Sequence, residues 1–155
     1  LTLRGRARAV FATLSIATFV LLTLGIGPNV VKFSEASPLA ADAARWQPWA
    51  PGKVDALLAS GRPVFVDFTA AWCVTCQVNK QTTLRNPQVL QAFAAKKVLL
   101  LRADWTRQDP AISQALAALG RSGVPVYVLQ APGKEPQLLS ELLSPTVVMA
   151  ALDHL

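Results

Sequence analysis

The sequence predicts an α/β domain with a central mixed sheet and helices on both of its faces, preceded by one transmembrane helix. Three observations predict this architecture. Two short apolar runs, 64–69 and 98–104, alternate with segments of helical pattern, as in a βαβ unit. Two further strand-like runs, 126–130 and 137–143, are separated by a turn signal. The run from 9 to 31 contains no charged residue.

Residues 9–31 have the composition of a membrane-spanning helix. The run reaches the ~20 residues that a helix needs to cross ~30 Å of hydrocarbon. Arg4, Arg6 and Arg8 precede it, and Lys32 follows. By the positive-inside rule, we expect the N-terminus to stay in the cytoplasm and everything after Lys32 to lie outside.

Two other interpretations of this run stay open. A cleaved signal peptide also begins basic and then apolar, and Ala41-Asp42-Ala43 resembles a cleavage site, although the run exceeds the usual length of roughly 7–15 residues. The other interpretation is a buried core helix. The membrane span is favoured, and it divides the chain into a transmembrane helix with a basic flank (1–32), a linker (33–51) and a globular domain (52–155).

The charge distribution argues against a nucleic-acid partner. The chain is 52% hydrophobic and has a formal net charge of +6. Residues 1–32 contribute four of these charges because they contain no acid, whereas residues 33–155 carry eleven basic and nine acidic side chains. The globular part therefore lacks the basic stripe of a DNA- or RNA-binding protein.

The first elements of the domain have distinct local signals. Residues 53–60 form a helical pattern that ends at Gly61, as at a C-capping glycine. Residues 64–69 are apolar on both faces and predict a central strand. A helix then begins at Cys73 and breaks near Asn86-Pro87, because the residue before a proline avoids the helical region.

The second half of the domain continues the alternation of helix and strand. We expect, in chain order, a helix over 88–96, a buried strand over 98–104, a helix over 111–119 with Asp109 as its N-cap, a hairpin of strands 126–130 and 137–143, and a last helix begun by Ser144-Pro145. A βαβ unit followed by an antiparallel ββα unit predicts a mixed sheet with helices on both faces. Active groups belong at the carboxyl edge of the sheet, where the strand 64–69 ends.

The only two cysteines lie three residues apart, in Trp72-Cys73-Val74-Thr75-Cys76, directly after that strand. A helix beginning at Cys73 brings the two sulfurs close enough to bridge in its first turn. Its free N–H groups and positive end favour the Cys73 thiolate. The alternatives are half of a zinc site, a structural disulfide and chance. Zinc prefers about four ligands, and the chain adds only His154. The pattern favours a redox-active dithiol.

The motifs around the cysteines resemble a known superfamily. VFVDFTAAWCVTC, followed about fifty residues later by Gly123-Val124-Pro125, is similar to the thioredoxin superfamily. More narrowly, an uncharged span leading into VDFTAAWCVTCQVNK, then RADWTRQDP and SGVPVYVL, resembles the C-terminal part of the DsbD family of transmembrane thiol:disulfide interchange proteins. The resemblance implies a thioredoxin-like fold over about 46–155.

The resemblance assigns roles to three residues, and physical chemistry supports each of these roles. Cys73 would be the nucleophile, because it is nearest the helix N-terminus and the more exposed thiol. Cys76 would be the resolving thiol. Asp67 would be a buried acid beneath the second cysteine, with a raised pKa, able to relay a proton to or from Cys76. The alternative is an aspartate at a strand edge that meets water.

Three further residues would shape the site. The resemblance implies that Pro125 is a cis-proline facing the dithiol, although X–Pro bonds in general are cis in only ~5–6% of cases. Val124 would then offer its backbone to an incoming chain, as in β-augmentation. Trp72 would shield the site, or else be an ordinary core tryptophan.

Lys80 departs from the family pattern. DsbD-type domains often carry an acid four residues after the second cysteine, where this chain has Lys80. At that spacing the ammonium shares a helix face with Cys76 and should lower thiol pKa values. We therefore hypothesise a more acidic Cys73 than in the relatives, with a solvated surface lysine as the alternative.

The resemblance implies a thiol–disulfide oxidoreductase domain that accepts electrons from a membrane domain and reduces disulfides of periplasmic proteins and of other domains of its own polypeptide. Residues 9–31 would anchor it in the bacterial inner membrane, with the domain in the periplasm. No cofactor or metal is expected beyond the Cys73–Cys76 disulfide. A membrane-anchored oxidase or isomerase and a non-catalytic binding module of the same fold are the alternatives.

Overall fold

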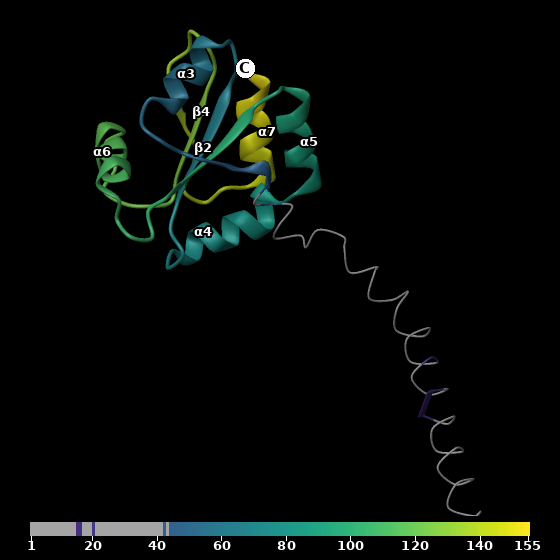
Figure 1. The fold of residues 1–155 in the computed structure, drawn as a ribbon. Coiled ribbons are helices and arrows are strands. Elements are labelled where there is room, and N and C mark those ends of the chain that lie inside the picture. Colours follow the sequence, from purple (N-terminus) through teal and green to yellow (C-terminus); the bar gives the residue numbers. More distant parts are fainter. Residues whose placement is uncertain (1–14, 17–19, 21–41, 43) are drawn as a thin grey trace, which may run out of the picture. The chain divides into compact units, whose positions relative to one another are not determined.

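The computed structural model describes residues 15, 16, 20, 42 and 44–155, and Asp42–Leu155 form one compact unit (Figure 1). The predicted membrane span, residues 9–31, therefore lies almost entirely outside the described residues. Among the residues that are described, no helix is long and apolar enough to span a membrane.

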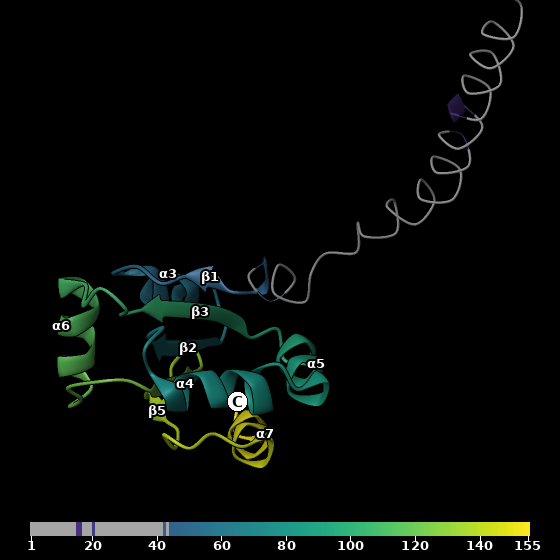
Figure 2. The same cartoon turned by 90° about the horizontal axis from the view of Figure 1, so that it is seen from below.

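A five-stranded mixed sheet forms the centre of this unit (Figure 1, Figure 2). Its strands lie in the order β1-β3-β2-β4-β5. The strands are β1 (Gln47–Pro48), β2 (Val64–Thr69), β3 (Leu99–Asp104), β4 (Val126–Gln130) and β5 (Gln137–Leu138). β3 runs parallel to both β1 and β2, whereas β4 is antiparallel to β2 and to β5. This mixed topology confirms the predicted sheet.

Strand β2 is the central strand, as its apolar sequence predicts. All six of its residues are buried, including the single charged one, Asp67. In the register of the sheet, Asp67 lies between Arg102 on β3 and Tyr127 on β4. The strand therefore delivers a carboxyl group into the middle of the sheet, six residues before Cys73.

Helices cover both faces of the sheet. They are α3 (Lys53–Ala59), α4 (Val74–Asn79), α5 (Pro87–Ala95), α6 (Pro110–Ala118) and α7 (Pro145–Asp153). The core around Phe65 and Tyr127 is closed by side chains of α5 and α7. The core around Val66 and Phe68 on the other face is closed by α3 and α6. Figure 1 shows these two helix pairs on opposite sides of the sheet.

The helix boundaries follow the predicted capping residues. Asp109 accepts hydrogen bonds from the first N–H groups of α6, and Ser144 accepts one from Val147 in α7. Gly61 has a left-handed φ of 80° just beyond α3, as a capping glycine requires. The expected break at Asn86-Pro87 is confirmed, because Asn86 caps α5. A π-helical segment, η2 (Lys80–Leu84), continues α4 and was not predicted.

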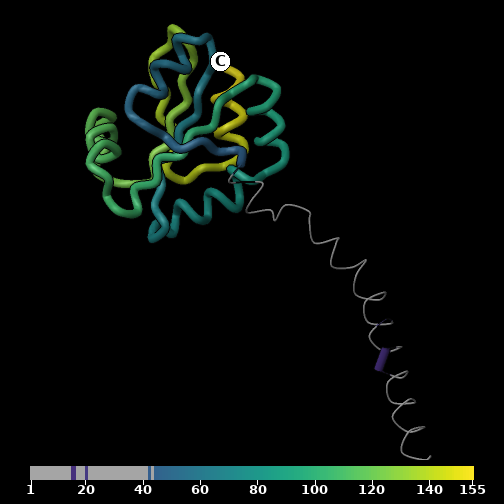
Figure 3. Tube along the Cα trace, viewed as in Figure 1, coloured from purple at the N-terminus to yellow at the C-terminus, as the bar shows by residue number. Residues whose placement is uncertain are grey.

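The second strand of the predicted hairpin is shorter than expected. Residues 137–143 were predicted as a strand, but β5 ends at Leu138. Beyond Leu139 the backbone bonds with two buried polar side chains instead of with β4: Leu143 donates its N–H to Asn79, and its carbonyl accepts from Thr83. These bonds draw the segment before α7 toward α4 and η2, a path that can be followed in Figure 3.

Part of the predicted linker belongs to the fold. Residues 33–51 were assigned to a linker, but Gln47 and Pro48 pair with β3, and Trp46 is buried against Phe65. A two-residue strand is too short to leave a period in the sequence, and its two side chains are exposed. Trp49 packs on the same domain, with its ring 6.1 Å from that of Phe68 and its backbone N–H donating to the Arg102 carbonyl.

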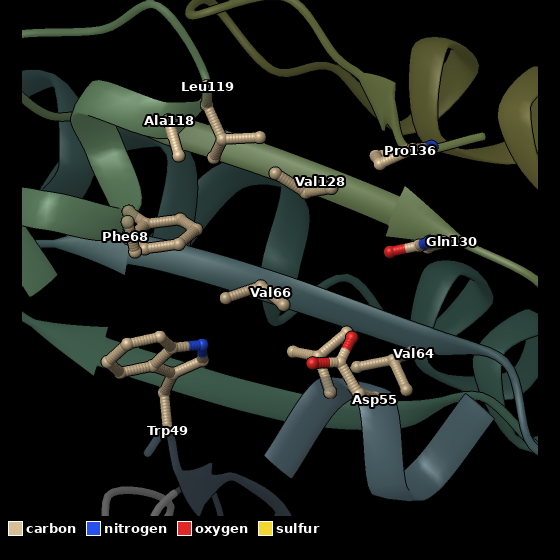
Figure 4. A pocket seen from close by; sticks show the side chains of 12 residues that line it. Trp49, Asp55, Val64, Val66, Phe68, Ala118, Leu119, Val128, Gln130 and Pro136 are labelled. Carbon is tan, nitrogen blue, oxygen red and sulfur yellow. The ribbon is translucent and has the colours of Figure 1, made fainter. Parts of the chain in front are cut away.

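An apolar cavity of about 320 Å³ lies on the α3–α6 face of the sheet (Figure 4). Val64, Val66 and Val128 line it from the strands, and Trp49 and Leu119 from the surrounding segments. Neither cysteine lines this cavity, so it is separate from the predicted site.

Candidate redox site at the start of helix α4

The two cysteines form a disulfide at the start of α4, just after the loop that follows β2. Cys73 is the N-cap of the helix, and its Sγ accepts a hydrogen bond of 3.1 Å from the Cys76 N–H. The two sulfurs form a disulfide, with the Cα atoms 5.2 Å apart. Cys73 is 7% exposed and Cys76 is completely buried. The expected order holds: the first cysteine is the more accessible one, at the positive end of the helix.

The disulfide sits in a small apolar cluster with Ala70 and Val124. The Val124–Pro125 peptide bond is cis, as the family pattern implies. Gln77 donates from its side-chain amide to the carbonyl of Ala70, 3.1 Å away, which ties the first turn of α4 to the loop before it. The topology therefore brings together the C-x-x-C turn and the Val124–Pro125 loop, which are some fifty residues apart in the sequence.

Trp72 is not a core tryptophan. Its side chain is 54% exposed, and its Nε1 donates to the carbonyl of Thr106, 3.1 Å away. Its ring lies 6.0 Å from that of Trp105 in a tilted arrangement. Val74 and Val78 on α4 are also exposed. The cysteine turn is thus flanked by apolar side chains that reach solvent.

Asp67 is a buried carboxyl group that is paired with a cation. It is completely inaccessible to solvent, so it is not the strand-edge aspartate of the alternative interpretation. Arg102 donates from Nε to Oδ2 at 3.1 Å. Burial raises the pKa of Asp67, and Arg102 and then Lys80 oppose that rise. The expected direction of the shift is therefore present in this structure.

Lys80 is half-buried at the start of η2 and is not a solvated surface lysine. Burial lowers its pKa, and the negative charge of Asp67 opposes that change. The ammonium therefore acts on the same buried carboxylate as Arg102. Its effect on the cysteine thiols stays a prediction, since both sulfurs are bonded to each other.

Several residues that shape the site were not predicted. Arg102 was visible only as a basic residue inside an apolar strand. Asn79, on α4, is buried and donates to the hydroxyl of Tyr127 and to the carbonyl of Glu141. Asn79 follows Cys76 by three residues and so shares its buried helix face, which was the signal available in the sequence.

The described residues contain no group of three or more His, Cys, Asp or Glu side chains that could hold a metal ion. His154, the only additional ligand considered for zinc, caps the end of α7 and is exposed.

Comparison with known proteins agrees with this geometry. A family model described as thioredoxin-like matches residues 45–132. The chain is 36% identical over 87 residues to the thiol:disulfide interchange protein DsbD 1 of Pseudomonas aeruginosa, covering 54% of this chain and 14% of that protein. It is 31% identical over 97 residues to DsbD of Vibrio cholerae, covering 63% of this chain and 16% of that protein. The chain thus spans between about a seventh and about a sixth of the length of these relatives.

Solved structures show the same fold. The reduced and the oxidised C-terminal domain of Neisseria meningitidis DsbD each match with a TM-score of 0.55 and 23% identity, covering 77% of this chain and 96% of theirs. A thioredoxin from Thermus thermophilus matches with a TM-score of 0.55 and 21% identity, covering 71% of this chain and 85% of that one. The chain belongs to the thioredoxin-like family, as a DsbD-related domain with a C-x-x-C disulfide.

Proposed function

We propose that this domain is a protein-disulfide reductase that accepts electrons from a membrane domain and passes them to periplasmic partner proteins through Cys73 and Cys76. The observation that carries the proposal is the disulfide at the N-terminus of α4, in which Cys73 retains 7% of its exposure and Cys76 is completely buried. A purely structural disulfide needs neither this asymmetry nor a position at the positive end of a helix.

The reaction proceeds in two exchanges. In the reduced domain, the Cys73 thiolate attacks one sulfur of the partner's disulfide, whose other sulfur leaves as a thiolate. The Cys76 thiolate then attacks Sγ of Cys73, which releases the partner's second thiolate and closes the Cys73–Cys76 bond. Two electrons pass to the partner, which takes up two protons. A dithiol of the membrane domain reduces the Cys73–Cys76 disulfide again.

Asp67 serves as the proton acceptor for Cys76 in the second exchange. The Cys76 sulfur is buried, so its proton needs a carrier within the protein. A carboxyl group whose pKa is raised by burial can take up a proton closer to neutral pH than an exposed aspartate can. Val124 and Pro125 position the partner's chain, Trp72 covers the site, and Lys80 tunes its charge.

The similarity to DsbD proteins supports a proposal for the location and the partners. We propose that residues 1–32 hold the chain in the inner membrane and that residues 52–155 work in the periplasm. The partners are proteins with exchangeable disulfides, including other domains of the same polypeptide. The dithiol requires no metal or organic cofactor.

The reduction potential of the Cys73–Cys76 pair tests this proposal. Equilibration with dithiothreitol or glutathione buffers should give a value near that of thioredoxin, ~−270 mV, whereas a value near ~−120 mV would make the domain an oxidase. Trapping with an alkylating reagent after mild dithiothreitol treatment addresses the remaining alternative. A disulfide that resists this treatment would indicate a binding module, and then the proposed reaction is wrong.

A further inference from the structure

A guanidinium group lies against the buried acid of the site. Arg102 and Asp67 are register partners on the neighbouring strands β3 and β2. Nε of Arg102 lies 3.1 Å from Oδ2 of Asp67, and the carboxyl group is completely buried. An ion pair in such surroundings is screened far less by solvent than one at the surface.

Two further contacts fix the position of this guanidinium. Its Nη1 lies 3.6 Å from Oδ2 of Asp42, at the start of the compact unit. The plane of Trp46 stacks against it, with the guanidinium carbon 4.3 Å from the ring centroid. Arg102 is thus held by an anion and an aromatic face as well as by Asp67, and its Nε stays directed at Oδ2.

The two oxygens of Asp67 have different surroundings. Oδ2 accepts the hydrogen bond from Arg102, whereas Oδ1 is buried and makes no hydrogen bond within the described part of the chain. A buried acceptor without a partner is costly, and such atoms are often found at functional sites. Oδ1 is therefore the oxygen that remains available for a proton.

We infer that Arg102 is a positioning residue of the redox reaction: it keeps Asp67 ionised and occupies Oδ2, so that Oδ1 accepts the proton of Cys76. The inference rests on the proposed function and extends it to a residue that does not touch the reacting sulfurs. Arg102 acts only through Asp67, because its guanidinium cannot take up a proton at physiological pH.

The charged groups around Asp67 set the direction of the expected effect. Arg102 on β3 and Lys80 on η2 favour the carboxylate, whereas burial and the charge of Asp42 favour the protonated acid. Tyr127 on β4 stays neutral, since burial and Asp67 both raise its pKa. Loss of the guanidinium removes the largest favourable charge, so Asp67 should ionise only at higher pH.

The resolving step can be followed with Ellman's reagent. Reduced protein releases one thionitrobenzoate when Cys73 attacks and a second when Cys76 resolves the mixed disulfide. In Arg102→Gln, the pH midpoint of the second release should rise by about one to three pH units, the range by which an adjacent Arg lowers the pKa of an aspartate. Arg102→Lys keeps the positive charge, so its midpoint should lie close to that of wild type. Arg62→Gln removes the same charge from an exposed position and should leave the midpoint unchanged.

A double variant separates positioning from general destabilisation. In an Asp67→Asn background, Arg102→Gln should move the midpoint no further, because its effect passes through Asp67. A midpoint unaffected by Arg102→Gln, or shifted equally in both backgrounds, overturns the inference. If Arg102→Gln does not fold, the inference can be tested by following the carboxyl carbon of Asp67 by NMR in wild type and in Arg102→Lys. If this resonance titrates like that of a solvent-exposed aspartate in both proteins, the inference is refuted. A wild type that releases no second thionitrobenzoate refutes the proposed function instead.

Discussion

Replacing Asn79 by alanine should destabilise the domain more than any other single substitution of a polar residue on α4. The Asn79 side chain makes three hydrogen bonds: Nδ2 donates to the Tyr127 hydroxyl at 2.9 Å and to the Glu141 carbonyl at 2.7 Å, and Oδ1 accepts from the Leu143 N–H at 3.2 Å. The amide therefore joins the cysteine-bearing helix to β4 and to the segment before α7.

The magnitude follows from what the substitution leaves behind. Glu141 is exposed, so water can replace the lost bond to its carbonyl. The Tyr127 hydroxyl and the Leu143 N–H belong to buried residues, and a buried group without a partner costs roughly 1–3 kcal/mol. Two such groups, with partial relaxation, give a loss of about 2–4 kcal/mol in the free energy of unfolding.

Urea unfolding of the oxidised protein, followed by tryptophan fluorescence, measures this loss. Thr82→Ala is the matched control. Thr82 is exposed, and its hydroxyl donates to the Val78 carbonyl and makes one long contact of 3.5 Å with the Thr83 hydroxyl, so the substitution should cost less than about 0.5 kcal/mol. If Asn79→Ala unfolds at the same urea concentration as Thr82→Ala with an unchanged m-value, the amide does not hold the helix and the reasoning fails.

Three further predictions concern the site itself. Burial raises the folded-state pKa of Asp67 above 3.8, so its stabilising contribution is complete below that pH and is lost as pH rises through the folded-state pKa. In urea titrations, Asp67→Asn should therefore gain stability relative to wild type between pH 4 and pH 7. A difference in stability that stays constant over this range contradicts the pKa shift. Lys80→Glu should raise the pKa of the reduced Cys73 thiol, measured by thiolate absorbance; an unchanged pKa means that Lys80 does not act on the sulfur. Trp72→Ala should slow the reduction of a protein disulfide more than that of a small disulfide, and equal slowing argues against a docking role for this exposed ring.

The sequence predicts those parts of the fold that depend on residues close together in the chain. The apolar run of β2 predicts its central place, and Asp109 and Ser144 predict the starts of α6 and α7. Strand β1 was not predicted, because its two exposed residues are too few to show the alternating pattern of a strand. The end of β5 depends on the hydrogen bonds that Leu143 makes with Asn79, to which it donates, and with Thr83, from which it accepts; both lie some sixty residues away, and no local pattern encodes such distant partners.

The residues of the candidate site likewise include some that local sequence predicts and others that depend on distant parts of the chain. Cys73 and Cys76 follow from spacing alone, and Asp67 stands out as an acid within an apolar strand. The ion pair of Asp67 with Arg102 could not be derived, because it depends on the register of β2 against β3. An arginine inside a second apolar strand was a usable signal, because buried charges are paired and Asp67 is the acid of the other apolar strand.

The edges of the sheet have a consequence for self-association. Both edge strands, β1 and β5, are only two residues long, and proline lies within the first and directly before the second, at Pro48 and Pro136. Proline cannot donate to a strand ladder, and short edges offer little template for pairing. Neither edge therefore favours open-ended stacking of one copy on the next. If the domain accepts partner chains beside Val124 as proposed, these short, proline-containing edges keep the rest of its backbone from pairing with further copies.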